Sequence, residues 1–110
     1  MMQAVTVVVT TLPDAETADA ITREALETRV AACVQQAVPV RSSYRWEGSL
    51  ETTDEYTLTF KTSPARAQAL VDLIAARHPY AVPEIVSWTV DASLSYAQWV
   101  QTETSVPIHV

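Results

Sequence analysis

Residues 33–62 read CVQQAVPVRSSYRWEGSLETTDEYTLTFKT, and they hold two β-like segments on either side of one turn. In YTLTFK, residues 56–61, large apolar and polar side chains alternate with the period of two typical of a half-buried strand. Pro39 has no N–H to donate to a strand ladder, so it marks a bulge or a sheet edge. We therefore expect a β-hairpin with strands at about 33–46 and 50–62.

The hairpin is long for so small a chain. Residues 33–46, at about 3.3 Å each, would span about 46 Å if fully extended. A compact domain of 110 residues has a diameter of only about 34 Å. The hairpin, which turns at Glu47-Gly48-Ser49, should therefore bend sharply or project. Projecting strands leave unpaired edges that proteins usually cover, and pairing with another subunit is the simplest cover.

The segment before the hairpin predicts a strand and a helix. Residues 3–11, QAVTVVVTT, form a β-branched run that is apolar almost throughout, which favours a central strand. Asp14 is a good N-cap for a helix at about 15–31. Apolar residues recur there at helical spacing, at Ala18, Ile21, Ala25, Leu26 and Val30.

Further elements follow the hairpin. Ser63 and Pro64 are the cap and the first residue of a second helix, which ends at His78-Pro79. Residues 85–91 predict a strand, and residues 93–103 predict a short helix. The last residues, VPIHV, could add a short strand. The apolar stripe of the second helix is Ala67, Leu70, Val71 and Ile74, and that of the last helix is Tyr96, Trp99 and Val100.

The order of elements is strand, helix, strand, strand, helix, strand and a last helix. This is the split βαβ arrangement of an α+β, ferredoxin-like βαββαβ sandwich, in which helices cover one face of an antiparallel sheet. Right-handed crossovers leave few alternatives to that topology. No linker, repeat or low-complexity segment interrupts the chain, so we expect a single domain over residues 1–110 with an additional C-terminal helix.

Composition argues against several classes of function. Seven Lys and Arg stand against thirteen Asp and Glu, and the net charge of −6 disfavours nucleic acid as a partner. Gly48 is the only glycine, which argues against nucleotide-binding loops. Cys33 is the only cysteine, so no intrachain disulfide can form. The N-terminal apolar run is too short to span a membrane and too β-branched for a signal peptide, so we expect a cytoplasmic protein without membrane contact.

Three blocks of sequence resemble those of one known family. They are VVVTTLPDAETA at residues 7–18, RVAACVQQAVPVRSSYRWEGSLE at 29–51, and RHPYAVPEIVSWTVD at 77–91, followed by YAQWVQ at 96–101. The S-x-Y-x-W-x-G and H-P-Y-x-V-P-E-I patterns are the specific ones, and they stand in order on the expected elements. Over about residues 4–102 the chain is similar to the CutA family of divalent-cation tolerance proteins.

The resemblance implies a ferredoxin-like fold, a tight homotrimer held by β-pairing between subunits, and an architecture similar to that of PII signalling proteins. It also implies a role in tolerance of divalent cations, especially copper, with copper or another divalent cation as a weakly bound ligand. It implies no catalytic reaction, so we expect a non-enzymatic protein. A second hypothesis is a signalling or scaffold trimer that binds a small ligand or a protein partner at clefts between subunits. A hydrolase or other enzyme at such a cleft has the least support.

Cys33, His78 and Glu84 are the candidate metal ligands. A thiolate suits copper, and the resemblance puts a cysteine in this AAC segment. A neutral imidazole binds copper or zinc, and Glu84 follows His78 by six residues. The alternatives are structural: Cys33 can be a small buried residue at a helix-to-strand junction, and His78 can hydrogen-bond free carbonyls at a helix end. His109, in the terminal VPIHV, is interpreted as a solvated tail residue.

The resemblance places five residues near a cleft between subunits: Tyr44, Trp46, Lys61, Tyr80 and Glu84. Lys61 paired with Glu84 could orient an anionic or zwitterionic small ligand. The alternative is an interfacial salt bridge with an aromatic cluster that serves assembly.

Two other sets of polar residues are interpreted without a catalytic role. Asp54 and Glu55 are expected on the solvated face of the 50–62 strand and not as an acid/base pair. Ser42, Ser43 and Ser49 lie in no nucleophile elbow.

Overall fold

The computed structural model describes residues 1–105, so the short strand expected at 106–110 and the solvated His109 lie outside the described residues. None of the helices within residues 1–105 is long and apolar enough to cross a membrane. The elements in chain order are β1 (Met2–Leu12), α1 (Ala15–Glu27), β2 (Cys33–Gln36), β3 (Val40–Trp46), β4 (Ser49–Thr62), the 3-10 turn η1 (Pro64–Arg66), α2 (Ala67–Arg77), β5 (Ile85–Ser93) and α3 (Leu94–Glu103).

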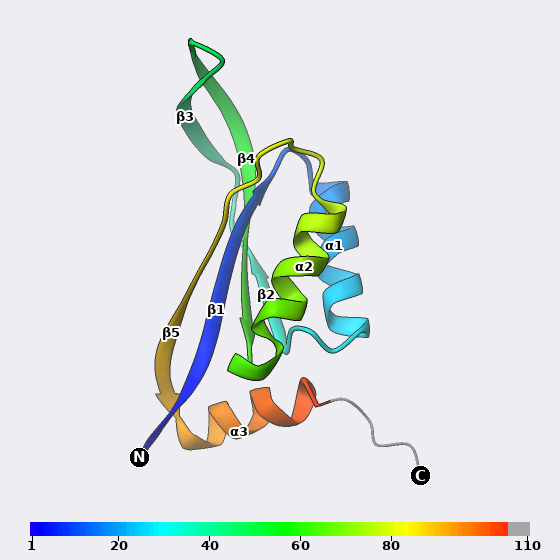
Figure 1. Cartoon of the computed structure of the whole chain (residues 1–110), viewed down its shortest axis with the longest axis vertical. Coiled ribbons are helices and arrows are strands. Elements are labelled where there is room, and N and C mark those ends of the chain that lie inside the picture. Colours follow the sequence, from blue (N-terminus) through cyan, green and yellow to red (C-terminus); the bar gives the residue numbers. More distant parts are fainter. Residues whose placement is uncertain (106–110) are drawn as a thin grey trace.

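The described strands form an antiparallel sheet in the order β2-β4-β1-β5, with β3 paired to the other half of β4 (Figure 1). β1 therefore lies between two strands, which confirms the central position expected from its apolar, β-branched run. β2 and β3 pair with the same strand, so together they act as one bent strand. When β2 and β3 are counted as one strand, the order of elements matches the expected ferredoxin-like βαββαβ arrangement followed by a third helix.

A bulge separates β2 from β3. Gln36 pairs with Leu58 and Val40 pairs with Glu55, so residues 37–39 stand opposite residues 56 and 57. Three residues against two is the geometry of a β-bulge, which bends the strand and increases its twist. The bulge contains Pro39, as the sequence predicted.

The β3–β4 hairpin projects beyond the helical layer, as its length requires (Figure 1). The molecule is 52 Å along its longest axis. Trp46 pairs with Ser49, which leaves a two-residue turn of Glu47 (φ 49°) and Gly48 (φ +82°). Positive φ at both turn residues is the type I′ geometry, whose twist matches that of the flanking strands.

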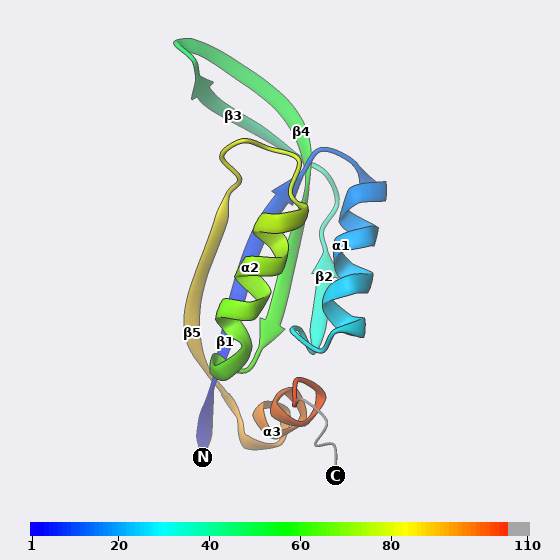
Figure 2. The same ribbon diagram turned by 45° about the vertical axis from the view of Figure 1, so that its right-hand side comes forward.

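Helices α1 and α2 lie side by side over one face of the sheet (Figure 2). The core between the two layers is built from fully buried side chains of the sheet and of both helices. Its large members are Val8, Leu12, Leu58, Phe60, Ile21, Leu70 and Ile74. The alternation read from residues 56–61 is confirmed, because Leu58 and Phe60 point into this core.

The first helix is shorter than predicted. It begins after the Asp14 cap, whose carboxylate accepts a hydrogen bond from the Thr17 N–H at 2.7 Å, but it ends at Glu27 and not at residue 31. Arg29 has a φ of 60°, and this left-handed residue turns the chain so that Val30 is buried outside the helix. Leu26, expected in the buried stripe, is 41% exposed.

The apolar face of α3 was predicted correctly for Val100 and wrongly for the two aromatic residues. Val100 is buried with Ala97 against Val5 of β1, whereas Tyr96 and Trp99 are exposed. Helix α3 crosses the end of the sheet opposite the hairpin, and this placement decides which of its residues meet β1 (Figure 1).

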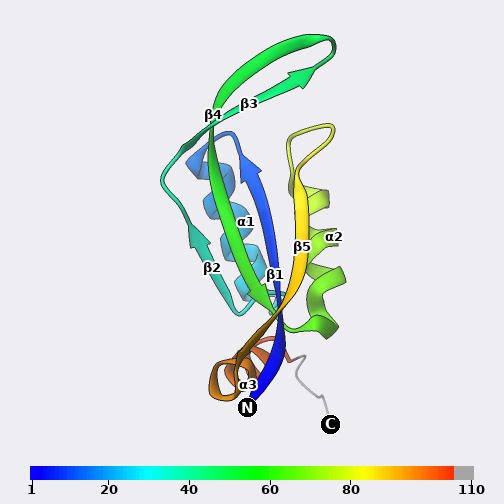
Figure 3. The same cartoon turned by 90° about the vertical axis from the view of Figure 1, so that its left-hand side faces the viewer.

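The sheet face away from α1 and α2 is largely uncovered (Figure 3). Strand pairing aligns Lys61, Val7 and Trp88 in one row and Thr59, Val9 and Val86 in the next. Trp88 is 48% exposed and Val86 is 45% exposed. An aromatic and an aliphatic side chain therefore stand open on this face, beside the outer edge of β5.

Candidate functional site

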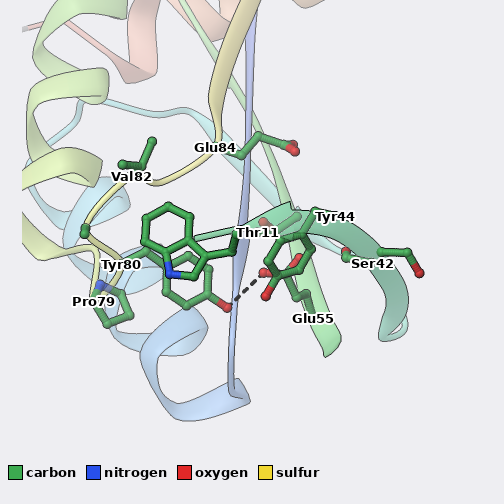
Figure 4. Close-up of a pocket in the computed structure, with 11 residues that line it drawn as sticks. Thr11, Ser42, Tyr44, Glu55, Pro79, Tyr80, Val82 and Glu84 are labelled. Atoms are coloured by element: carbon green, nitrogen blue, oxygen red, sulfur yellow. Dashed lines mark hydrogen bonds between the residues drawn. The ribbon is translucent and has the colours of Figure 1, made fainter. Parts of the chain in front are cut away.

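A pocket of about 660 Å³ opens at the base of the projecting hairpin (Figure 4). Three parts of the chain form it: the β3–β4 hairpin, the end of β1, and the loop of residues 78–84 between α2 and β5. We call it the hairpin pocket. Its lining residues are Thr11, Ser42, Ser43, Tyr44, Trp46, Glu55, Pro79, Tyr80, Ala81, Val82 and Glu84.

The alternation of β3 places three of its four lining residues on one face, and Ser43 is the exception. Val40 pairs with Glu55, so even-numbered residues of β3 share a face with odd-numbered residues of β4. Ser42, Tyr44 and Trp46 therefore lie on the same side as Glu55 and line the pocket.

The positively charged residues of β3 lie on the other side of the hairpin. Arg41 and Arg45 alternate with Tyr44 and so belong to the opposite face. Arg41 approaches Asp54 there, with 3.9 Å between Nε and Oδ1. The charged side chains of β3 therefore do not line the hairpin pocket.

Tyr80 and Glu55 join the 78–84 loop to the hairpin. The Tyr80 hydroxyl donates a hydrogen bond to Glu55 Oε2 at 2.8 Å (Figure 4). Burial, followed by this hydrogen bond and by the charge of Glu55, raises the pKa of Tyr80 well above its ordinary value. A phenolate would put a second negative charge against the carboxylate, so the phenol stays protonated and keeps donating.

The prediction that Glu55 is solvated was wrong, because only 6% of this residue is exposed. Alternation along β4 does place Glu55 on the face opposite Leu58 and Phe60, where solvent was expected. What buries it is Tyr80, from a loop 25 residues further along the chain. The pattern of β4 carries no signal of that contact. The separate HPY motif was the feature that could have suggested an aromatic cover.

His78 holds the loop in place through both ring nitrogens. Nε2 lies 2.8 Å from the Thr11 carbonyl oxygen, which can only accept, so Nε2 carries the hydrogen. Nδ1 then accepts the backbone N–H of Tyr80 at 3.2 Å. The two rings also contact each other, with centroids 4.9 Å apart. His78 is thus occupied as a C-cap that positions Tyr80. Its role is structural, as the alternative from the sequence proposed, but the carbonyl that it contacts belongs to β1 and not to the helix end.

Glu84 belongs to the lining of the same pocket. Its backbone carbonyl accepts a hydrogen bond from the Thr10 hydroxyl at 2.7 Å, which anchors the start of β5 to β1. Its side chain is exposed and lines the pocket. Of the five residues expected at a cleft, the structure brings together four: Tyr44, Trp46, Tyr80 and Glu84.

Lys61, the fifth, lies elsewhere in the chain. It is paired with Val7, whereas Thr11 at the pocket is paired with Thr57, so four residue steps, or about 13 Å, separate the two rows. The Lys61 ammonium donates to the side-chain oxygen of Gln35 on β2. The expected pairing of Lys61 with Glu84 does not occur within one chain.

Cys33 is likewise separated from the other two candidate metal ligands. It pairs with Lys61 at the far end of the sheet and is partly buried. Tyr96 of α3 lies beside it: burial, with the charge and hydrogen bonding of Cys33 adding to it, raises the pKa of Tyr96. Among residues 1–105, no three His, Cys, Asp or Glu side chains are gathered as a metal site would require.

The sequence of this chain is similar to that of known proteins of one family. The family model described as CutA1 divalent ion tolerance protein matches residues 6–103. "Divalent-cation tolerance protein CutA" of Thermus thermophilus is 35% identical over 99 residues, which are 89% of this chain and 96% of that protein. "Protein CutA" of Homo sapiens is 35% identical over 95 residues, 86% of this chain, and the chain spans about half (53%) of that relative's length.

A solved structure agrees with the fold. The crystal structure of CutA from Xylella fastidiosa superposes with a TM-score of 0.88 at 37% sequence identity. The match covers 92% of this chain and 98% of that one.

Proposed function

The chain belongs to the CutA1 divalent ion tolerance family, and we propose that it serves divalent-cation tolerance as a non-enzymatic, cytoplasmic homotrimer with a PII-like architecture. The observation that carries the assembly is the uncovered sheet face, where Trp88 and Val86 stand open beside an unpaired strand edge. An apolar face of this kind is usually covered in a stable protein.

Free strand edges on β5 and on β3 explain how copies would join. In residues 1–105, β5 pairs only with β1 and β3 pairs only with β4, so the outer edge of each is unpaired. The edges are different, so pairing β5 of one copy with β3 of the next is a heterologous contact, which forms a ring when the rotation closes. Such pairing would cover both edges and turn the open faces toward one another.

Two measurements test the assembly. Light scattering should give three times the mass of one chain, and reversible melting should shift to higher temperature as protein concentration rises. Trp88→Lys would place a charge on the face to be covered, and it should weaken the trimer. A monomeric wild-type protein would refute the proposal.

For the cation itself, we propose weak binding of copper or another divalent cation, with the Cys33 thiolate as the soft ligand. His78 and Glu84 remain in the proposal as further ligands. His78 could bind a metal only by giving up its contact with the Tyr80 N–H or with Thr11, because both ring nitrogens are occupied. Cys33 lies apart from both, so a shared site would need ligands from more than one chain.

Titration of the purified protein with Cu(I) and Cu(II) tests this proposal. We expect saturable binding that Cys33→Ala abolishes or strongly weakens. His78→Ala should have a smaller effect on binding and a larger effect on stability, because its contacts are structural. Ser49→Ala, at the exposed hairpin turn and outside the hairpin pocket, is the control. No saturable binding in the micromolar range, or unchanged binding in both variants, would contradict metal binding by these residues.

A second candidate function is a signalling or scaffold trimer that binds a small ligand, and the hairpin pocket supports it. The pocket is large enough for a small molecule, and it lies where the exposed hairpin could also meet a protein partner. A thermal-shift screen of metabolites, with a pull-down for partners, tests this function. If no metabolite changed the melting temperature and no partner were captured, the result would count against this second function.

A further inference from the structure

We infer that the hairpin pocket recognises a small organic cation, the protonated amine of an alkyl chain, between its aromatic rings and its two carboxylates. This inference rests on the second proposed function, the binding of a small ligand at this pocket. It differs from the anionic or zwitterionic ligand expected from a Lys61–Glu84 pair, which does not form within one chain.

The charge of the pocket favours a cation. Among the described lining residues, Glu55 and Glu84 are the charged ones, and both are acidic. Basic side chains nearby are turned away: Arg41 and Arg45 lie on the other face of the hairpin, and Arg77 contacts Glu24 with 3.1 Å between Nε and Oε1. An anion would meet two carboxylates and no cationic lining residue, whereas an ammonium group would meet two partners.

The aromatic side chains supply the second half of the recognition. Tyr44, Trp46 and Tyr80 line the pocket from two different parts of the chain (Figure 4). Tyr44 and Trp46 are each 42% exposed within one chain, so the packing of that chain leaves part of each residue uncovered. Cations are attracted to aromatic faces, most strongly to that of Trp. Aromatic surface beside carboxylates is a combination that suits an alkylammonium group.

Glu55 is held in one orientation, which makes it a preorganised partner. Tyr80 donates to Oε2, and within residues 1–105 no hydrogen bond occupies Oε1. Tyr80 is in turn fixed by His78, whose Nδ1 accepts the Tyr80 N–H. A ligand N–H therefore finds an acceptor that is already ordered, so little side-chain entropy is lost on binding.

The end of α2 adds to the same preference. The helix ends at Arg77, and its C-cap His78 is followed by Pro79 and Tyr80, which line the pocket. The C-terminus of a helix carries a partial negative charge, which stabilises cations within about one turn. The side-chain charges, the aromatic faces and the helix end thus all favour the same class of ligand.

The test uses the assembled full-length protein and two probes of the same length. The cation is 1,5-diaminopentane, and the neutral control is 1,5-pentanediol. Calorimetry or ligand-observed NMR at low ionic strength should show saturable binding of the diamine and no saturable binding of the diol. Added salt should weaken the diamine binding, because partly exposed charges are screened.

Variants locate the binding in this pocket. Glu84→Gln should weaken diamine binding about tenfold, because hydrogen bonds to a charged partner contribute about 1.5 kcal/mol or more. Trp46→Leu should weaken it about threefold to fivefold through loss of a cation–π contact. Asp54→Asn removes the same charge from the other face of β4 and is the matched control, with unchanged binding expected. Glu84 is exposed, so its variant tests the inference even if a Glu55 variant fails to fold.

Three results would overturn the inference. The first is no binding of the diamine at about 10 mM, a concentration that would fill a weak site with a millimolar Kd. The others are equal binding of diol and diamine, and equal binding of the diamine by wild type and by Glu84→Gln. Its failure is distinguishable from failure of the proposed function. A trimer whose pocket binds other metabolites but not the diamine would refute the cation alone. A trimer whose melting temperature is changed by none of the metabolites would refute ligand binding as a whole.

Discussion

Removing the Tyr80 hydroxyl should destabilise the fold by about 2 kcal/mol. Tyr80→Phe keeps the ring and its contact with His78 but deletes the 2.8 Å hydrogen bond to Glu55 Oε2. Glu55 is 94% removed from solvent, since 6% of it is exposed. A hydrogen bond to a charged group contributes about 1.5–3 kcal/mol, and a carboxylate left buried without it keeps the cost of desolvation.

Urea unfolding at fixed protein concentration measures this loss, since assembly makes apparent stability depend on concentration. Tyr44→Phe is the control, because its hydroxyl lies 3.4 Å from the Thr53 hydroxyl on the exposed hairpin. That contact is long and solvated, so the control should lose less than about 0.5 kcal/mol. Adding Glu55→Gln to the wild type and to Tyr80→Phe completes a double-mutant cycle, in which we expect a coupling free energy of at least about 1 kcal/mol.

The Tyr80–Glu55 contact should also make stability depend on pH. The pKa of Tyr80 is raised above its ordinary value of 10.0 by burial first and by Glu55 second. Folding therefore favours the protonated phenol, so the stabilisation is fully present below pH 10 and is lost as the pH rises above it. Stability of the wild type should fall more steeply above pH 10 than that of Tyr80→Phe. A loss below about 0.5 kcal/mol in Tyr80→Phe, or parallel alkaline profiles, would refute the role given to this hydrogen bond.

Three further changes test the fold. Asp14→Ala should lower the melting temperature, because Asp14 caps α1. The hydrogen bond from the Thr17 N–H lowers the pKa of Asp14, so folding favours the carboxylate. The difference in melting temperature from wild type should therefore vanish as the pH falls below about 4. Phe60→Ala should cost about 3–5 kcal/mol in urea unfolding, since Phe60 is fully buried in the core, and a cost near 1 kcal/mol would show that the site collapses. Gly48→Ala should cost about 1 kcal/mol through its φ of +82° alone, because no atom lies within 4 Å of an added Cβ; a large loss would point to a clash instead.

Local patterns predicted the elements of this protein because each depends on neighbours in the chain. The period of two in residues 56–61 placed Leu58 and Phe60 in the core, and the apolar run of β1 gave its central position. Pro39 lies in the bulge, and Asp14 caps α1, since both effects act within a few residues. The end of α1 was misjudged because helical spacing continues to Val30, while the left-handed Arg29 that stops the helix has no strong sequence signal.

The candidate site required tertiary structure, because its parts come from three distant segments. The S-x-Y-x-W alternation was enough to place Tyr44 and Trp46 on one face of the hairpin. It could not show that Tyr80 covers Glu55, or that Lys61 lies about 13 Å along the sheet from the pocket row. Burial of a carboxylate and the sign of a pocket's charge depend on what packs across from a strand, and a strand's own sequence does not contain that information.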